Sequence, residues 1–143
     1  MNFASQICTT REQSERLLAL GLKKETGDIV IRPDNTLIII NENSFIYHNL
    51  EKAMQEGYFP AWSLHRLIEM MPQGIQDCSY RCFALAVNSQ GVSYEYHYID
   101  EEGKGYNESI GCIDLSDSLY DDIIAHIEWL IKDGLFNKEY LEE

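Results

Sequence analysis

The sequence predicts an α+β protein in which about three or four helices pack on a small antiparallel sheet of about four strands in two hairpins. Three segments carry apolar residues at helical spacing, which predicts amphipathic helices. Two pairs of segments rich in β-branched and aromatic residues are separated by turn residues, which predicts the hairpins. The length of 143 residues is that of one ordinary domain, so we expect residues 1–143 to form a single domain.

The first helix is marked at both of its ends. Thr9 or Thr10 can cap its start, and Glu12 or Gln13 lies three residues later, where a capping box requires it. At the other end, Gly21 lies where a residue of left-handed conformation ends a helix. We therefore expect the first helix to end at this glycine.

The strands are expected in two places. Residues 28–32 and 36–41 are apolar and β-branched, and they flank a turn that contains proline, aspartate and asparagine. Residues 80–88 and 92–99 show the clearer alternation and are joined by a turn ending in glycine. The segment that follows, residues 100–109, is rich in glycine and charge, so we expect an irregular loop there.

The segment around Trp62 has the signals of a helix that is fixed at its start. With Ser63 as the N-cap, Trp62 and Leu67 have the spacing of a hydrophobic staple. Pro72 ends the helix, and Arg66 falls off its apolar stripe, so we expect this side chain in solvent. Trp62 is therefore interpreted as structural, and the alternative is that it lines a binding pocket.

The last helix carries the broadest apolar stripe of the chain. Ser116 or Ser118 can cap it, and Asp121 and Asp122 lie near its N-terminal end, where the helix dipole favours negative charge. Gly134 is placed to end it. The expected helices thus begin near residues 10, 49, 63 and 118.

The charge is concentrated in the last third of the chain. Residues 1–99 hold 11 acidic and 8 basic side chains, whereas residues 100–143 hold 13 acidic and 3 basic ones. A field of this sign repels phosphates, so we expect no direct binding of nucleic acid. A basic protein partner is compatible with it.

The composition also limits the compartment and the chemistry. The longest apolar run, Leu37 to Ile40, is far shorter than the roughly 20 residues of a membrane helix, and we identify no secretion signal. We therefore expect no membrane association, a cytoplasmic protein and four reduced, buried cysteines. The histidines are scattered singly, so we expect no metal site and no cofactor. Cys112 and His126 are the least implausible catalytic pair, although buried inert thiols are the favoured interpretation.

Two groups of side chains are candidates for binding another protein. The first is a row of tyrosines, Tyr94, Tyr96 and Tyr98, which alternation places on one face of a strand and which Tyr80 could join. The alternative is that these tyrosines pack under a helix. The second group is the acidic face of the last helix, whose residues are Asp121, Asp122 and Glu128. The alternative for this group is that it only promotes solubility.

Three motifs follow one another along most of the chain. They consist of Glu12, Gln13, Ser14, Leu17 and Leu18, then Pro60 to Leu64 with Pro72, then Trp129 and Leu130. This order resembles a group of small proteins from prophages and other mobile elements of gut anaerobes, a group without an assigned activity. The resemblance implies a cytoplasmic accessory protein expressed from a phage-derived region, and it carries over no site residue.

Two classes of function follow. The first is a small acidic interaction protein that binds a basic partner through the tyrosine row or the acidic helix. The second is a small enzyme with a pocket near Trp62 and a cysteine-based site. A homo-oligomer that uses the tyrosine row on itself is a further alternative.

Overall fold

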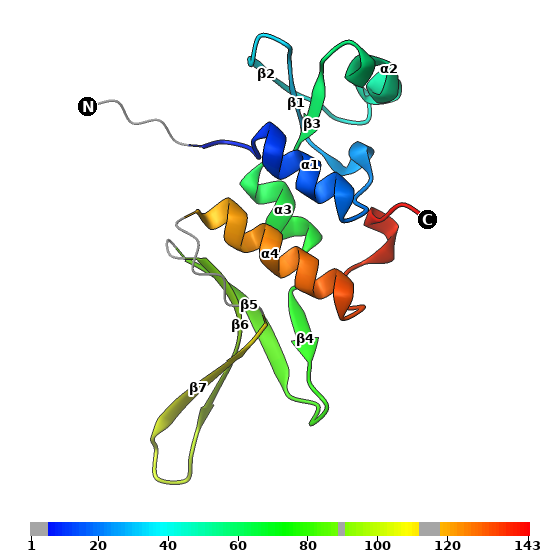
Figure 1. Cartoon of the computed structure of the whole chain (residues 1–143). Helices are drawn as coiled ribbons and strands as arrows, with labels where there is room; N and C mark the ends of the chain where they lie inside the picture. Colours follow the sequence, from blue (N-terminus) through cyan, green and yellow to red (C-terminus); the bar gives the residue numbers. More distant parts are fainter. Residues whose placement is uncertain (1–5, 89–90, 112–117) are drawn as a thin grey trace, which may run out of the picture. The chain divides into compact units, whose positions relative to one another are not determined.

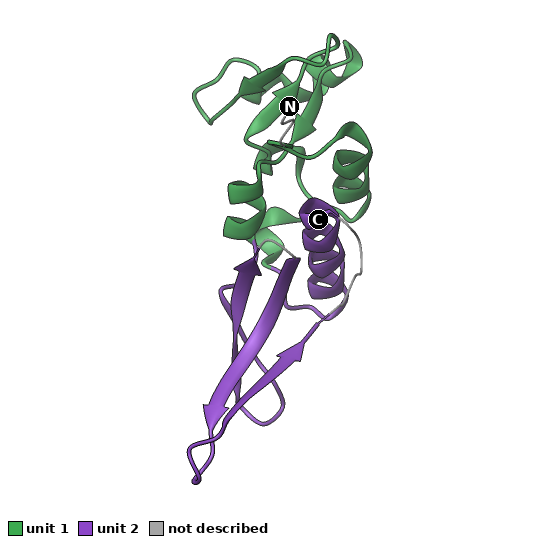
Figure 2. Cartoon of the chain, turned by 90° about the vertical axis from the view of Figure 1, so that its left-hand side faces the viewer, with its two compact units in different colours: residues 1–70, 137–143 green, residues 71–136 purple. Residues whose placement is uncertain are grey.

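The computed structural model describes residues 6–88, 91–111 and 118–143, and in this part the chain is α+β, as predicted (Figure 1). Seven strands within these ranges form two separate antiparallel sheets, so the expectation of about four strands in one sheet was too low. The internal contacts group the chain into two compact units (Figure 2): unit 1 comprises residues 1–70 and 137–143, and unit 2 comprises residues 71–136. The single domain stays a prediction.

Unit 1 contains a three-stranded sheet of order β2-β1-β3. The strands are β1 (Ile29–Ile31), β2 (Leu37–Ile39) and β3 (Phe59–Ala61). The β1–β2 hairpin confirms the predicted one, with Val30 opposite Ile38. The third strand was not expected, because three residues that include a proline give no alternation to detect.

The helices of unit 1 begin and end where the sequence indicates. In α1 (Arg11–Ala19), Thr10 and Gln13 form the capping box. At its C-terminal end the Leu22 amide donates to the Leu17 carbonyl at 3.2 Å, across a left-handed Gly21. The short α2 (Leu50–Gln55) confirms the helix expected near residue 49.

Trp62 lies in the core of unit 1, as its structural interpretation requires. It is fully buried, and its Nε1 donates to Thr26 Oγ1 at 3.0 Å. Ser63 Oγ accepts from the Arg66 amide at 3.1 Å and so caps α3 (Leu64–Met70), which ends two residues before Pro72. The staple spacing is thereby consistent with the structure, in which Trp62 and Leu67 are both fully buried.

The expectation that the Arg66 side chain lies in solvent was wrong, because this side chain is half-buried. Its Nε donates to the Thr26 carbonyl at 2.8 Å, and its guanidinium lies 5.6 Å over the Tyr140 ring. Tyr140 belongs to the C-terminal segment of unit 1, where its carbonyl accepts from the Lys23 amide at 2.9 Å. The C-terminal segment thus covers the arginine that periodicity alone places in solvent.

Unit 2 is a four-stranded antiparallel sheet and one long helix. The sheet has the order β4-β5-β6-β7. Its strands are β4 (Gly74–Gln76), β5 (Cys82–Asn88), β6 (Gly91–Ile99) and β7 (Gly105–Ile110), and the helix is α4 (Leu119–Lys132). The β5–β6 hairpin was predicted. The loop expected at residues 100–109 is instead a tight turn followed by β7.

Helix α4 covers one end of one face of this sheet. Ser118 caps the helix, and its stripe is buried. The Trp129 ring lies 6.1 Å from the Tyr94 ring, and Gly111, just after β7, faces the same tryptophan. The helix therefore lies where β6 begins and β7 ends, and the rest of the β6–β7 hairpin extends beyond it (Figure 1).

A buried carboxylate joins α4 to β6. Asp122, 5 % exposed, accepts from the Val92 amide through Oδ2 at 2.7 Å. Gly91 leaves the space for this contact, because a Cβ at that position would lie 2.3 Å from the same oxygen.

We expect Gly91→Ala to lower the free energy of unfolding by about 1–3 kcal/mol, because the added methyl group displaces the Asp122 carboxylate. Gly105→Ala is the control for a strand glycine whose Cβ would meet no atom within 4 Å, and Gly103→Ala, at a φ of 83° with the same open space, is the control for backbone strain, because Gly91 has a φ of 153°. Denaturant unfolding of the three variants measures the difference. Equal stabilities would contradict the proposed role of Gly91.

Candidate functional site

Four aromatic rings follow one another across the covered face of the unit 2 sheet and beyond α4. We call Phe83, Tyr96, Tyr98 and Tyr106 the aromatic row. The ring centroids of successive members are 5.7, 5.6 and 5.0 Å apart, and the Tyr98 and Tyr106 rings are nearly parallel at 11°. The row forms because the side chains of these residues lie on the same face of the sheet on three neighbouring strands, and Tyr98 is directly opposite Tyr106.

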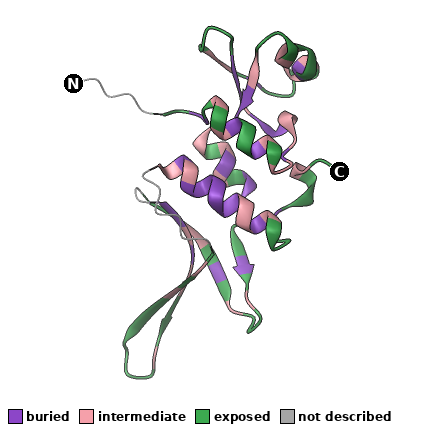
Figure 3. Cartoon of the chain, in the orientation of Figure 1, coloured by how far each residue is buried: buried purple, intermediate pink, exposed green. Residues whose placement is uncertain are grey.

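The exposure of the tyrosines on β6 increases with distance from α4 (Figure 3). Tyr94 is fully buried, and burial raises the pKa of its hydroxyl, which donates to the Pro72 carbonyl at 2.7 Å. Tyr96 is half-buried, whereas Tyr98 is 36 % exposed and its neighbour Tyr106 is 38 % exposed. The aromatic row is therefore core at one end and surface at the other.

Two cations already lie against the aromatic row. The Arg81 guanidinium lies 5.5 Å from the Phe83 ring centroid and 5.6 Å from that of Tyr96. Lys104 Nζ lies 5.2 Å over the Tyr106 ring. Both arrangements have the geometry of a cation–π interaction, so the faces of these rings accept positive charge.

Arg81 is held by carboxylates, which keeps it beside the row. It pairs with Asp77 at 2.7 Å across the β4–β5 turn and with Glu108 on β7. The hydrogen bonds that the guanidinium donates to these carboxylates, that to Asp77 first, raise its pKa although desolvation opposes them. The arginine therefore remains charged and links β7 to the turn before β5.

The turn at the end of the β6–β7 hairpin is organised by Asp100. Its Oδ1 accepts from the amides of Glu102 and Lys104, both at 2.9 Å, and Gly103 supplies the positive φ that the turn needs. The Tyr106 hydroxyl donates a further hydrogen bond to Asp100, which raises the pKa of that hydroxyl. The turn thus fixes the position of the Tyr106 side chain as well as the chain reversal.

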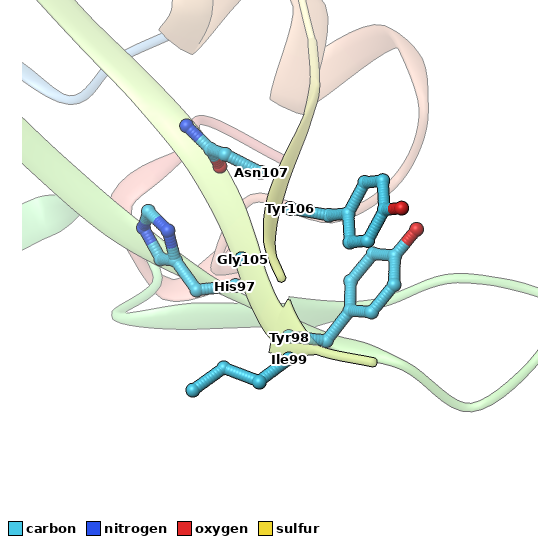
Figure 4. A pocket seen from close by; sticks show the side chains of 6 residues that line it. All are labelled: His97, Tyr98, Ile99, Gly105, Tyr106 and Asn107. Carbon is cyan, nitrogen blue, oxygen red and sulfur yellow. The ribbon is translucent and has the colours of Figure 1, made fainter. Parts of the chain in front are cut away.

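The opposite face of this hairpin carries the polar side chains of His97 and Asn107 and one exposed apolar side chain, Ile99. Figure 4 shows Tyr98 and Tyr106 side by side on one side of the hairpin, with His97 and Asn107 on the other. A shallow surface pocket is lined by the end of the hairpin, including Gly105, whose missing side chain leaves space opposite Ile99. This face offers a matched control surface for the aromatic row.

Several predicted tyrosine and tryptophan positions are not available at the surface. Trp62 and Tyr94 are fully buried, so both belong to the cores of their units. Tyr80 is exposed but lies in the β4–β5 turn with a φ of 61°, so it does not extend the row. Tyr106 takes that place, and the alternation from Tyr106 to Ile110, opposite the tyrosines of β6, was the signal for it.

The acidic face of α4 is also less accessible than expected. Asp122 is buried against the sheet, because its carboxylate is the acceptor for a β6 amide. Asp121 is half-buried in the first turn, and its amide approaches Ser118 Oγ at 3.4 Å. Glu128 pairs with Lys132 at 2.9 Å. These three acids therefore do not form one exposed acidic surface.

Of the predicted catalytic pair, Cys112 and His126, the structure describes only His126. His126 is 2 % exposed, and its Nδ1 donates to the Asp122 carbonyl at 2.8 Å, while Cys112 lies outside the described residues. Of the described thiols, Cys8 is buried, and burial together with Asp28 raises its pKa. Cys78 and Cys82 are exposed, which corrects the expectation of buried thiols, because they lie at the β4–β5 turn and on the uncovered sheet face.

Comparisons with protein-family models, with curated proteins and with solved structures find no match for this chain. Within the described residues, no helix combines the length and the apolar composition needed to cross a membrane. In the same residues, histidine, cysteine and carboxylate side chains form no cluster of three or more that could hold a metal ion.

We expect Asp100 to titrate below its ordinary pKa of 3.8, because the Lys104 amide is the first of several hydrogen bonds that favour its charged form. The stability that it contributes is present above that ordinary value and is lost as the pH falls through the lowered pKa. Carboxyl NMR titration measures this directly.

Asp100→Ala should also disturb the amide signals of Glu102 and Lys104, which lose their acceptor. Glu101→Ala, one residue along the same turn, serves as the control. A pKa at or above the ordinary value would contradict the role of Asp100 in this turn.

Proposed function

We propose that this protein is an interaction protein that binds a basic segment of another protein through the exposed end of the aromatic row, Tyr98 and Tyr106. The observation that carries the proposal is this stacked pair, which is more than one-third exposed in a strongly acidic unit. We place this binding in the cytoplasm, where an accessory protein of a phage-derived region acts.

The chemistry of the row supports a contact surface. Tyrosine offers a large, stiff ring with a polar hydroxyl, so it gains contact area at a small entropy cost. Tyr98 and Tyr106 hold each other in a nearly parallel arrangement before any partner arrives. This preorganisation lowers the cost of binding.

The charge of unit 2 supports a basic partner. Residues 71–136 hold 12 acidic and three basic side chains. Glu101 and Glu102 are exposed in the turn next to Tyr106. Tyr96 and Tyr106 already have Arg81 and Lys104 over their rings, so an arginine or lysine of the partner that takes the place of Lys104 fits both the Tyr106 ring and the surrounding field. The same field disfavours a second copy of the chain.

We expect the double substitution Tyr98→Ala and Tyr106→Ala to weaken binding of the basic partner by roughly tenfold or more, because the stacked rings are lost. The measurement is affinity capture from the host-cell lysate at low and high ionic strength, followed by titration of the captured protein. Retention should fall at high salt, because charge steers this contact.

The matched control is His97→Ala with Asn107→Ala, which alters the opposite face of the same hairpin. The control should retain the partner. Substitution of Asp122 is unsuitable for such a test, because it breaks the contact between α4 and β6. Equal binding by the tyrosine variant, with its fold intact, would contradict the proposal. Light scattering that shows a stable homo-oligomer lost in the tyrosine variant would favour self-association instead.

A further inference from the structure

The outer edge of β7 is open in the described part of the chain. This strand is the last in the order β4-β5-β6-β7, and it has six residues. Each of the other terminal strands, β2, β3 and β4, has three residues. Among the described residues, the structure shows no backbone hydrogen bond from another strand to the outer side of β7.

The register of the hairpin identifies the backbone groups on this open edge. The Asp100 amide donates to the Lys104 carbonyl at 2.9 Å, so these two residues form a hydrogen-bonded pair. In an antiparallel ladder such pairs alternate with non-bonded ones. Tyr106, Glu108 and Ile110 therefore bond to β6, whereas Gly105, Asn107 and Ser109 direct their amides and carbonyls outward.

The β7 edge lacks most of the sequence features that prevent another strand from pairing with an exposed sheet edge. Natural edge strands are commonly short, or they carry lysine, proline or a bulge. The β7 sequence, GYNESI, contains neither lysine nor proline, and its register with β6 is continuous over six pairs. The charge of Glu108 lies on the face of the aromatic row and pairs with Arg81.

We propose that the basic partner adds an extended segment to the outer edge of β7 as a fifth strand. This inference rests on the proposed function and specifies how the partner is held. The outward amides and carbonyls of Gly105, Asn107 and Ser109 supply the backbone hydrogen bonds, as in other cases of strand addition.

The side chains beside β7 define the sequence of the added strand. Alternate residues of the strand lie next to Tyr106 and Glu108, because directly opposite Cβ atoms in a sheet are about 4.5–5.5 Å apart. An arginine opposite Tyr106 can take the place of Lys104 over that ring, and an arginine opposite Glu108 can share that carboxylate with Arg81. The residues between them face Asn107 and Ser109, where small or β-branched polar residues fit.

The test uses an eight-residue peptide that alternates arginine with threonine or valine, titrated into the full-length ¹⁵N-labelled protein. The comparison peptides have the same sequence with N-methyl groups on alternate residues, one for each edge of the strand. We expect the plain peptide to shift the amide signals of Gly105, Asn107 and Ser109. The peptide methylated on its pairing edge should bind more weakly by about three- to tenfold for each blocked amide.

Substitution of the protein tests the same edge from the other side. Asn107→Pro removes an outward amide without removing a bond to β6, whereas Asn107→Ala removes only the side chain. We expect Asn107→Pro, and not Asn107→Ala, to weaken binding. Ser109→Pro with Ser109→Ala repeats the comparison, should the first proline variant fail to fold.

The possible results separate the two proposals. Loss of binding in the Tyr98→Ala and Tyr106→Ala variant, with no effect of either proline variant or of N-methylation, would overturn strand addition and leave the proposed function standing. No binding of any peptide, together with no capture of a basic protein, would overturn both. A dimer of the free protein that dissociates in Asn107→Pro would show a second copy on this edge and overturn the assignment to a partner.

Discussion

The Asp122 carboxylate accepts a hydrogen bond from the Val92 amide at 2.7 Å, and the arrangement of unit 2 depends on this contact. It fixes α4 over the beginning of β6, where Gly91 leaves room for the carboxylate. The buried acid is costly to remove from water, so it is tolerated only with its hydrogen bonds in place. Because the helix is held at this end, the remainder of the long β6–β7 hairpin extends beyond α4.

The exposed half of the hairpin carries tyrosines at the pleat positions that belong to the core nearer α4. Tyr94, Tyr96 and Tyr98 occupy equivalent positions of the pleat, yet only Tyr94 is fully buried. Exposed aromatic surface lowers solubility, and the proposed partner would cover this end of the row. The ion pairs of Arg81 and the Asp100 turn also hold the rings in place, while Tyr98 and Tyr106 stay more than one-third exposed.

Local chemistry predicted much of the fold. Thr10, Ser63 and Ser118 cap the helices as expected, and Gly21 and Gly134 end two of them, because caps depend on residues within one turn. The short strands β3 and β4 were missed because three residues show no alternation to detect, and β7 was missed because its sequence is polar and its alternation is weak. The same limit applies to the site: the tyrosine row was visible in β6, whereas its continuation at Tyr106 depends on the register of a hairpin.

Burial was the least predictable property of the candidate residues. Asp122 lies beside the apolar stripe of α4, and nothing in its neighbourhood indicates that a strand amide from residue 92 will meet it. Arg66 is covered by Tyr140, which lies near the C-terminal end of the chain, and helical periodicity cannot predict such a contact. In both cases a polar residue on the edge of a helical stripe is buried by a segment that is remote in sequence.

The central claim is that the far end of the aromatic row is open in the free protein and covered by a basic partner. The most direct measurement uses ring-labelled tyrosine in the full chain, with a soluble paramagnetic agent that attenuates the NMR signals of exposed rings. We expect attenuation at Tyr98 and Tyr106 but not at Tyr94, and recovery of both signals when an arginine-rich strand peptide is added. Signals of Tyr98 and Tyr106 that are as protected as that of Tyr94 without the peptide, or that do not recover with it, would contradict the account.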